Sequence, residues 1–360
     1  MNILFRVDSS DIIGTGHLYR CLNFADLYSD SNNITFISKK HSFNLNNKIK
    51  EKYTCYEIEL KNSNNINLNI DTWLGESEID DADKTINIIK DNNLNIDWLI
   101  IDHYSITKIW EEKLNKYVKK ICVIDDFTDR KHNCNIIINQ QLNNNMINKY
   151  KNIINDDCKI LAGNDYLFFN KLYYNLIKKE KYIKKLERIN IFMGGSDLFN
   201  VTGKIIDICN KFNKYNNLNI TFDVIIGKSN KNYENIKSKI KKIDNFNLYY
   251  DLKFIGNLLF KADLAIGAPG TTSYERCITQ TPTLLICLAD NQNVVIKKLL
   301  ETKTCKYIGN IHSNYSKVLL NNLHYLNKNV NELKDMSIHC KNFIDLKKNK
   351  SKDILYKSNS

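Results

Sequence analysis

The placement of glycine and proline is the feature that most constrains how this chain can fold. Its 360 residues include only 12 glycines and 2 prolines. Six of the glycines fall in three short places, at 14–16, 194–195 and 267–270, and both prolines lie in or just after the third. A chain this poor in glycine and proline keeps them where the backbone needs unusual dihedral angles or must approach a ligand closely. The three places are therefore candidate functional turns.

Each of the three turns follows a strand-like segment and precedes a helix-like one. Short apolar, β-branched runs are typical of strands buried on both faces. They occupy 3–7, 33–38, 98–102, 120–125 and 135–139, and then 189–193, 222–227, 264–268, 283–288 and 306–309. Helical patterns alternate with them, as at 17–30, 201–213 and 272–280. The alternation predicts an α/β fold built from parallel βαβ units, in which ligands bind at the carboxyl ends of strands.

The two series of strands predict two Rossmann-like domains that face each other across a cleft. The first domain is expected at 1–180 and the second at 186–345. The charged stretch 171–187 has a helical character and is the predicted connector. Residues 346–360 are polar and basic, which predicts a frayed tail.

Composition excludes several classes of protein. With 43% hydrophobic residues the chain can form real cores, so global disorder is excluded. The net charge of +12 comes from lysine spread along the chain without an arginine-rich block, which favours an anionic small substrate over nucleic acid. No run reaches the ~20 apolar residues of a membrane helix, and the first residues lack a signal-peptide pattern. The ten cysteines form no CxxC pair, so we expect a cytoplasmic protein with reduced thiols and no structural zinc or membrane partner.

The first turn ends in Gly16 and His17, where a helix is expected to begin. A helix N-terminus presents free N–H groups and a partial positive charge, which suits an anion. A histidine at this end is favoured in its neutral form, which can act as a base. The alternative is that His17 is an ordinary polar residue at a helix start, and the turn alone favours that alternative.

The second turn has the same layout. Gly195 and Ser196 follow a strand, and a helix begins after Asn200. Such a turn lets backbone amides approach a phosphate, and the serine hydroxyl adds a donor. A simple strand-to-helix turn is the alternative.

The third turn is the richest in polar groups. Gly270, Thr271, Thr272 and Ser273 form a hydroxyl-rich helix start that suits a pyrophosphate, and Glu275 follows in the first turn of the helix. A carboxylate at this place can accept both hydroxyls of a ribose, as acidic residues do in dinucleotide-binding folds. The alternative is a glutamate that only complements the helix dipole. After the next strand, Asn291 and Gln292 are expected to line the same cleft.

Two further segments have open interpretations. The strand 98–102 ends in Asp102, followed by His103 and Tyr104, which could form the cleft floor or cap the next segment. The segment 124–135 contains a loose acidic cluster that resembles a metal-binding pattern, but its spacing favours a loop without metal.

Taken together, the motifs RVDSSDIIGTGHLYRCL, MGGSDLFNVT and GAPGTTSYERCITQTPTLLICLADNQ, with IDHY and VIDDFTDR, resemble a known family. They are similar to those of the UDP-2,4-diacetamido-2,4,6-trideoxy-β-L-altropyranose hydrolases, which serve pseudaminic acid synthesis for flagellin glycosylation. The resemblance spans roughly residues 1–310. The family resembles the glycosyltransferases that build the lipid-linked peptidoglycan disaccharide, which implies the GT-B fold. The segment 40–95 carries no motif of this kind.

The resemblance implies a role for each motif. His17 matches the family's catalytic histidine, the base that activates water, and Asp8, Asp102 and Tyr104 are candidates to orient it. The expected nucleotide-sugar ligands are Asn200, Glu275 and Asn291, with the hydroxyls of Ser196 and Thr271–Ser273 along the diphosphate. The backbone at Gly16, Gly195 and Gly270 and the side chain of Gln292 complete the predicted site.

The reaction that the resemblance implies is attack of water at the anomeric carbon of a UDP-sugar, with inversion and release of UDP. It needs no metal, no cofactor and no obligatory protein partner. The alternatives are a glycosyltransferase of the same fold, a UDP-N-acetylglucosamine epimerase that also hydrolyses, and a non-catalytic nucleotide-sugar binding protein.

Overall fold

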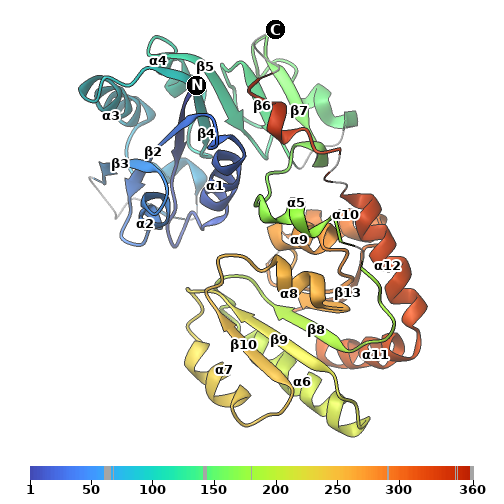
Figure 1. Ribbon diagram of the computed structural model, residues 1–360. Helices are drawn as coiled ribbons and strands as arrows, with labels where there is room; N and C mark the ends of the chain where they lie inside the picture. The colour runs from blue at the N-terminus through green and yellow to red at the C-terminus, as the bar shows by residue number, and fades with distance from the viewer. Residues whose placement is uncertain are drawn as a thin grey trace. The chain divides into compact units, whose positions relative to one another are not determined.

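Figure 1 shows a computed structural model of the protein. It describes residues 1–60, 66–67, 69–140, 144–179, 181–289, 292–344, 346 and 348–356. The chain divides into two compact units. The N-terminal unit comprises Met1–Lys171 with Lys348–Ser360, and the C-terminal unit comprises Leu172–Lys347. The domain boundary expected at 180 therefore falls inside the second unit.

The N-terminal unit contains a parallel sheet with the strand order β3-β2-β1-β4-β5-β6-β7 in the described residues. The strands are β1 (Asn2–Val7), β2 (Asn33–Lys40), β3 (Thr54–Glu59), β4 (Ile96–Asp102), β5 (Val118–Ile124), β6 (Ile136–Asn139) and β7 (Lys159–Ala162). The order reverses between β1 and β4, where Val7 is paired with Asp102. Ligands of open parallel sheets bind at this kind of reversal, outside the carboxyl ends of the strands.

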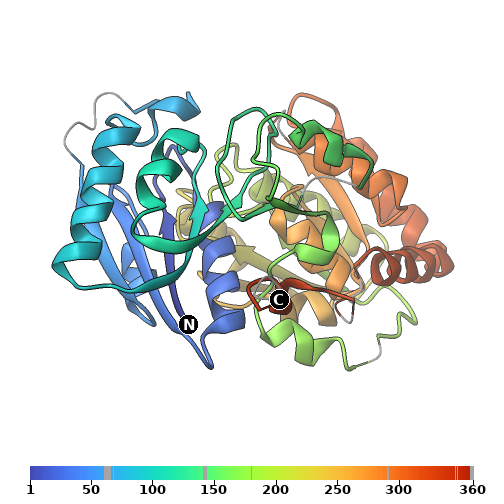
Figure 2. The same ribbon diagram turned by 90° about the horizontal axis from the view of Figure 1, so that it is seen from above.

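Helices cover both faces of this sheet. They are α1 (Gly16–Tyr28) and α2 (Asn46–Lys50) on one face and α3 (Glu78–Asp91) and α4 (Lys108–Leu114) on the other. In the first core Phe5 stacks on Phe36, with ring centroids 4.8 Å apart. In the second, α3 and α4 lie side by side over the sheet (Figure 2). Both faces are thus buried, which is why the central strands are nearly continuous apolar runs.

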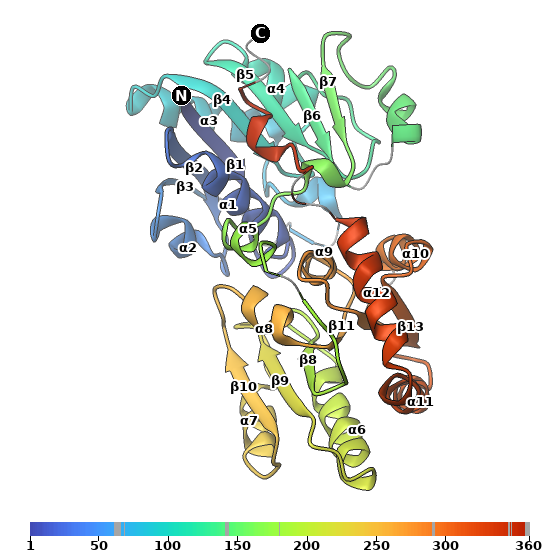
Figure 3. The same ribbon diagram turned by 45° about the vertical axis from the view of Figure 1, so that its right-hand side comes forward.

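The C-terminal unit has a second parallel sheet, with the order β10-β9-β8-β11-β12-β13 in its described residues (Figure 3). Its strands are β8 (Arg188–Phe192), β9 (Thr221–Ile226), β10 (Phe246–Tyr250), β11 (Leu264–Gly267), β12 (Thr283–Cys287) and β13 (Cys305–Asn310). Its helices are α5 (Leu172–Leu176), α6 (Val201–Tyr215), α7 (Tyr233–Ile240), α8 (Gly256–Lys261), α9 (Thr271–Ile278), α10 (Asn293–Glu301), α11 (Tyr315–Lys328) and α12 (Val330–Phe343). The order reverses between β8 and β11, and the second and third glycine turns follow these two strands.

The predicted α/β fold with two Rossmann-like units is confirmed, and all ten predicted strands are present. None of the helices that the structure describes combines the length and apolar character needed to cross a bilayer.

The connector is helical only over α5, so the prediction of a helix along 171–187 is wrong for 181–187. Lys181 lies in the C-terminal unit, where its ammonium donates to the hydroxyl oxygen of Thr281 at 2.8 Å and to the carbonyl of Thr279 at 3.2 Å. Ile183 and Leu186 are buried in the core of the same unit. These tertiary contacts outweigh the helical propensity of the stretch.

The prediction of a frayed tail is wrong for residues 348–356, which pack on the N-terminal unit (red in Figure 1). Ile354 and Leu355 are buried in the same core as α1. The hydroxyl of Tyr28 donates to the carbonyl of Ser351 at 3.0 Å and accepts from the backbone N–H of Leu355 at 3.2 Å. The apolar pair within a polar tail was the available sequence signal.

Replacing Leu355 by alanine should lower the free energy of unfolding of the N-terminal unit by about 2–5 kcal/mol, because it removes a fully buried side chain and leaves a cavity. Denaturant unfolding would measure the change. The matched control is Leu198→Ala, which removes the same atoms from a side chain that is 72% exposed and should change stability by less than about 0.5 kcal/mol. Equal effects of the two variants would contradict the assigned packing.

Candidate active site

The first glycine turn and the end of β4 meet at the reversal point of the N-terminal sheet. His17 lies in the first turn of α1, and Asp102 is the last residue of β4. Their side chains are joined by a hydrogen bond of 2.7 Å between Nδ1 of His17 and Oδ1 of Asp102. Of the two interpretations of the β4 end, this arrangement favours a functional carboxylate over a cap.

Asp102 is held as a buried carboxylate. Arg20, one turn after His17 on α1, donates from Nε to Oδ2 at 2.8 Å and from Nη2 to Oδ1 at 2.7 Å. Burial alone would raise the pKa of Asp102, but the charge of Arg20 and the hydrogen bonds from His17 and Arg20 keep it well below its usual range. An ionised carboxylate at Nδ1 fixes a proton on that nitrogen and leaves Nε2 as the acceptor. His17 is therefore arranged to take a proton at Nε2.

The predicted supporting residue Tyr104 also lies at His17. Its ring meets the imidazole edge to face, with centroids 4.4 Å apart at 86°. Its hydroxyl donates to Asp126 at 2.7 Å, and Arg20 donates to both oxygens of Asp126 at 3.0 and 2.8 Å. Burial, followed by the charge of Asp126, raises the pKa of Tyr104, so it stays a neutral phenol. Arg20 thus links the two carboxylates that hold His17 and Tyr104.

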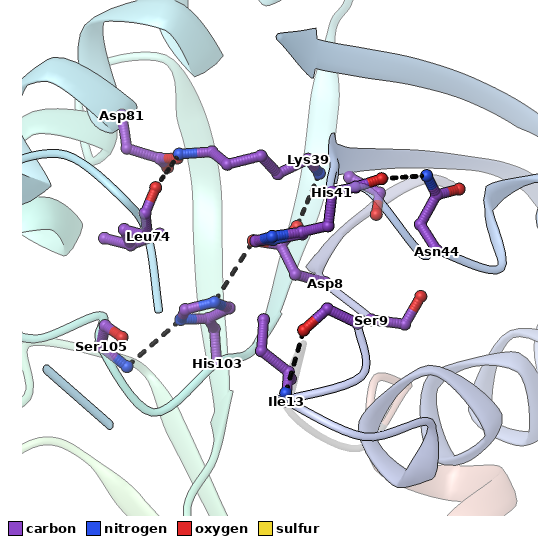
Figure 4. Close-up of polar contacts among 12 residues, drawn as sticks. Asp8, Ser9, Ile13, Lys39, His41, Asn44, Leu74, Asp81, His103 and Ser105 are labelled. Atoms are coloured by element: carbon purple, nitrogen blue, oxygen red, sulfur yellow. Dashed lines mark hydrogen bonds and ion pairs between the residues drawn. The ribbon is translucent and has the colours of Figure 1, made fainter. Parts of the chain in front are cut away.

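The other candidate support, Asp8, lies in a different cluster (Figure 4). Its carboxylate accepts from Arg6 at 2.5 Å and from the backbone N–H of Lys39 at 2.6 Å, and it lies 3.2 Å from Nε2 of His103. The hydrogen bonds of Asp8 in the described chain go to these neighbours and not to His17. It belongs to a buried ion network that ties β1 to β2.

The acidic loop at 124–135 uses its carboxylates in ion pairs. Asp125 accepts from Arg130 at 2.7 Å and from the hydroxyl of Tyr150 at 2.8 Å, while Asp126 pairs with Arg20. Across the described residues, no group of three or more histidine, cysteine or acidic side chains is placed to hold a metal ion.

In the C-terminal unit, the second glycine turn passes very close to the chain after β9. A Cβ atom on Gly227 would lie 2.5 Å from Cα of Gly195, so a side chain at 227 would collide with this turn. Ser196 is exposed beside them. The start of α6 is capped internally, because Asp197 accepts from the N–H groups of Val201 and Thr202, each at 2.9 Å.

Asn200 has a structural task at the same helix start. It adopts a left-handed backbone conformation, and its side-chain oxygen accepts from the N–H of Gly203 at 3.2 Å. This contact was not foreseen from the sequence, which favoured a ligand role. The N–H groups at the start of α6 are therefore bound by Asp197 and Asn200.

The third glycine turn leads into α9. Gly270 donates to the hydroxyl oxygen of Ser273 at 3.3 Å and its carbonyl accepts from the N–H of Ser273 at 2.9 Å, so this serine stabilises the turn itself. Thr271 is exposed and Thr272 partly exposed. The hydroxyl groups of this turn that solvent can reach therefore belong to these two threonines.

Glu275 is the fifth residue of α9, so it lies in the second turn of the helix and the prediction of a place in the first turn is wrong. Burial raises its pKa, while contacts with Tyr173, Arg276 and Thr272 act in the opposite direction. A carboxylate that loses water in this way gains most from added hydroxyl donors.

Gln292 accepts from the N–H of Leu288 at 2.8 Å and so supports its own turn. Asn291 lies outside the described residues.

Arg276 joins the two turns and was missed by sequence reasoning. Its guanidinium is buried and donates to the carbonyls of Phe192 at 3.0 Å and Ala268 at 3.1 Å, at the ends of β8 and β11. A Cβ atom on Gly267 would fall 1.9 Å from Nη2, so the glycine provides the space for the arginine. The signal was a glycine inside a strand pattern.

Two functional candidates of the N-terminal unit were also missed. Arg20 follows His17 by three residues, the spacing that places two side chains on one helix face, so its position could have been found. Trp73 lies with its ring 6.3 Å from that of His17, on a segment whose sequence carries no motif.

The chain is similar to proteins of known families. The model of a family described as lipid-A-disaccharide synthetase matches residues 165–353, which is more than half of the chain. The chain belongs to the lipid-A-disaccharide synthetase family. The match of this synthetase family lies almost wholly on the C-terminal unit, the unit with the second and third turns.

A relative of this member of the synthetase family supports the resemblance drawn from the motifs. The UDP-2,4-diacetamido-2,4,6-trideoxy-beta-L-altropyranose hydrolase of Campylobacter jejuni is 25% identical over 293 residues, which cover 81% of this chain and 93% of that protein. The resemblance to that hydrolase family is thereby confirmed over both units.

Solved structures of low identity show the fold. MurG of Acinetobacter baumannii has a TM-score of 0.60 at 11% identity and covers 99% of both chains. The UDP-GlcNAc 2-epimerase of Neisseria meningitidis, solved with UDP-GlcNAc, has a TM-score of 0.60 at 12% identity, covering 100% of this chain and 99% of that one. The predicted GT-B fold is confirmed for this synthetase-family chain.

Proposed function

We propose that this protein is an enzyme that acts on UDP-sugars, and that it hydrolyses a UDP-linked 2,4-diacetamido-2,4,6-trideoxy sugar to the free sugar and UDP. The observation that carries the proposal is the His17–Asp102 pair, a histidine held by a buried carboxylate at the reversal point of the sheet. The Campylobacter hydrolase, similar over 81% of the chain, supports the choice of reaction.

In the proposed reaction Nε2 of His17 takes a proton from a water molecule as the water oxygen attacks the anomeric carbon. The bond between that carbon and the UDP oxygen breaks on the opposite side, so the configuration inverts and UDP leaves with the bonding electrons. Asp102 stabilises the imidazolium and does not take the proton itself. The neutral Tyr104 and the paired Arg20 keep both groups in place.

The C-terminal unit is proposed to hold UDP. The exposed hydroxyls of Ser196 and Thr271, with Thr272 and the start of α9, are the donors for the diphosphate. Glu275 is proposed to accept the ribose hydroxyls. Donors of this kind stabilise the charge that develops on the leaving group, so the mechanism uses no metal.

Replacing Glu275 by alanine should raise the KM for the UDP-sugar and the Kd of UDP by about 10–100-fold, since hydrogen bonds to a charged group contribute about 1.5–3 kcal/mol. Titration with UDP would measure the change directly. Glu234→Ala removes the same group from the first turn of α7, where it is 78% exposed, and should leave both values unchanged. An unaltered Kd in Glu275→Ala would remove Glu275 from the nucleotide site.

The pathway is part of the same proposal. The motif resemblance favours a step of pseudaminic acid synthesis for flagellin glycosylation, carried out in the cytoplasm. Rescue of flagellin glycosylation in a strain that lacks this hydrolase step would test that assignment, and the His17→Ala variant should not rescue.

A glycosyltransferase is the second candidate, favoured by the synthetase family model and the fold of MurG. The hydrolase and transferase functions can be distinguished by incubating the protein with the UDP-linked diacetamido-trideoxy sugar, without an acceptor, and following the products by NMR. Release of UDP with an inverted free sugar supports the hydrolase. Intact substrate together with tight UDP binding would overturn hydrolysis and favour a transferase or a binding protein.

A further inference from the structure

Trp73 is an aromatic residue beside His17 to which neither the motifs nor the proposed mechanism gives a task. Its ring centroid lies 6.3 Å from that of His17, at 74°, and 5.7 Å from that of Tyr104. Its indole N–H donates to the carbonyl of Asn67 at 3.2 Å. Only 8% of the residue is exposed, so its ring is held in one place next to the imidazole.

Leu74, the residue after Trp73, is bound by a buried ion network that includes Lys39 and Asp81 (Figure 4). The ammonium of Lys39 donates to the carbonyl of Leu74 at 2.5 Å and pairs with Glu76 at 2.7 Å and Asp81 at 2.8 Å. Asp81 also pairs with Arg6 at 2.8 Å, and the side chains of Lys39, Asp81 and Arg6 are fully buried. Breaking such a buried network is costly because it leaves unpaired charge. The position of Trp73 is therefore preorganised.

The charged and the aromatic neighbours of His17 have different roles. The carboxylate of Asp102 and the guanidinium of Arg20 are paired with each other and occupy Nδ1. The rings of Tyr104 and Trp73 lie beside the imidazole and carry no charge, and the guanidinium of Arg130 lies over the Tyr104 ring, 5.3 Å from its centroid. A sugar whose anomeric carbon is attacked by a water bound to Nε2 must lie within roughly 6 Å of that ring, because each of the two gaps is about 3 Å. The centroid of the Trp73 ring lies 6.3 Å from that of the imidazole, so a sugar bound on this side of His17 would contact Trp73.

We propose that Trp73 determines the sugar specificity of this site by packing against a methyl-bearing part of the sugar. The inference rests on the proposed function and deepens it. A 6-deoxy sugar with two acetamido groups carries three methyl groups, whereas N-acetylglucosamine carries one and has a hydroxyl at C6. An aromatic face stabilises methyl groups and gives a hydroxyl no partner, so it favours the first sugar.

The test compares Trp73→Ala and Trp73→Phe with the wild type on two substrates, the UDP-linked diacetamido-trideoxy sugar and UDP-N-acetylglucosamine. One methyl group in an apolar site is worth about 10-fold or more in kcat/KM. We therefore expect Trp73→Ala to lose at least about 10-fold on the first substrate, mainly through KM, and less than about 2-fold on the second. Trp73→Phe should retain most of the preference. Tyr215→Ala, an aromatic truncation at a residue 87% exposed, should change neither.

A loss of equal size on both substrates, or a loss confined to kcat, would overturn the inference and leave Trp73 a structural residue. A second readout does not depend on turnover. Titration with the UDP-linked diacetamido-trideoxy sugar should change the tryptophan fluorescence beyond the change produced by UDP alone, and Trp73→Phe should abolish that excess. If no substrate is hydrolysed but the excess is present, the proposed hydrolysis fails and the sugar contact stands; if hydrolysis occurs without the excess, the contact fails.

Discussion

His17→Ala should lower kcat for UDP release by about 10²–10⁴-fold, the usual contribution of a positioned general base. The Kd of UDP should stay within about 2-fold, because the proposed nucleotide donors are in the C-terminal unit. Steady-state kinetics on the UDP-linked diacetamido-trideoxy sugar, with titration by UDP, would measure both. We expect kcat to fall without a change in the Kd of UDP because His17 contacts Asp102, Arg20 and Tyr104 of the N-terminal unit.

The control is His312→Ala, which removes an exposed imidazole from the C-terminal unit and should leave kcat unchanged. A His17→Ala variant that loses UDP affinity by the same factor as rate would contradict the role of base. It would place His17 among the groups that bind the nucleotide.

Asp102→Asn should lower kcat by at least about 100-fold while the protein stays folded. Both carboxylate oxygens of Asp102 accept from Arg20, and Oδ1 also accepts from His17. In asparagine one oxygen becomes an NH₂ group that faces an arginine donor, and the negative charge that keeps the proton on Nδ1 is lost. A base of the wrong tautomer cannot accept a proton at Nε2, and such changes have large effects on rate.

Asp83→Asn is the matched control, since Asp83 is 54% exposed in an ion pair with Lys113 on the same unit and exposed pairs contribute little. Thermal unfolding would establish that both variants are folded. Wild-type activity in Asp102→Asn would show that the hydrogen bond between Asp102 and His17 only stabilises the fold and does not set the tautomer of His17.

The strands that the sequence analysis missed have a common position in the fold. β3 and β7 are the two edges of the N-terminal sheet, and β10 is an edge of the C-terminal sheet. An edge strand is covered less than a central one, and the side chains of β3 and β10 are largely intermediate or exposed. The sequences of β3 and β10 mix polar and apolar residues and lack the continuous apolar run by which the central strands were found, while β7 has only a short one, KILA.

The residues of the candidate site also divide into those that the sequence could place and those that it could not. That His17, Asp102 and Tyr104 lie together could be predicted because glycine turns and strand ends mark the carboxyl edge of a parallel sheet. The contacts made by Asp8 and Asn200 could not, since a polar side chain at such an edge can serve the ligand or its own turn, and only tertiary geometry decides. Trp73 reaches His17 through a long connection between β3 and α3, and no local pattern encodes such an approach.

The return of residues 348–356 to the N-terminal unit affects how the protein is made. Leu355 and Ile354 complete a core whose other buried members all come from residues 3–168. During translation the ribosome must therefore synthesise the whole C-terminal unit before the N-terminal core can close. Domains usually fold as units in order of synthesis. In this chain the apolar side chains that Ile354 and Leu355 cover stay open to solvent until residues 348–356 have been made.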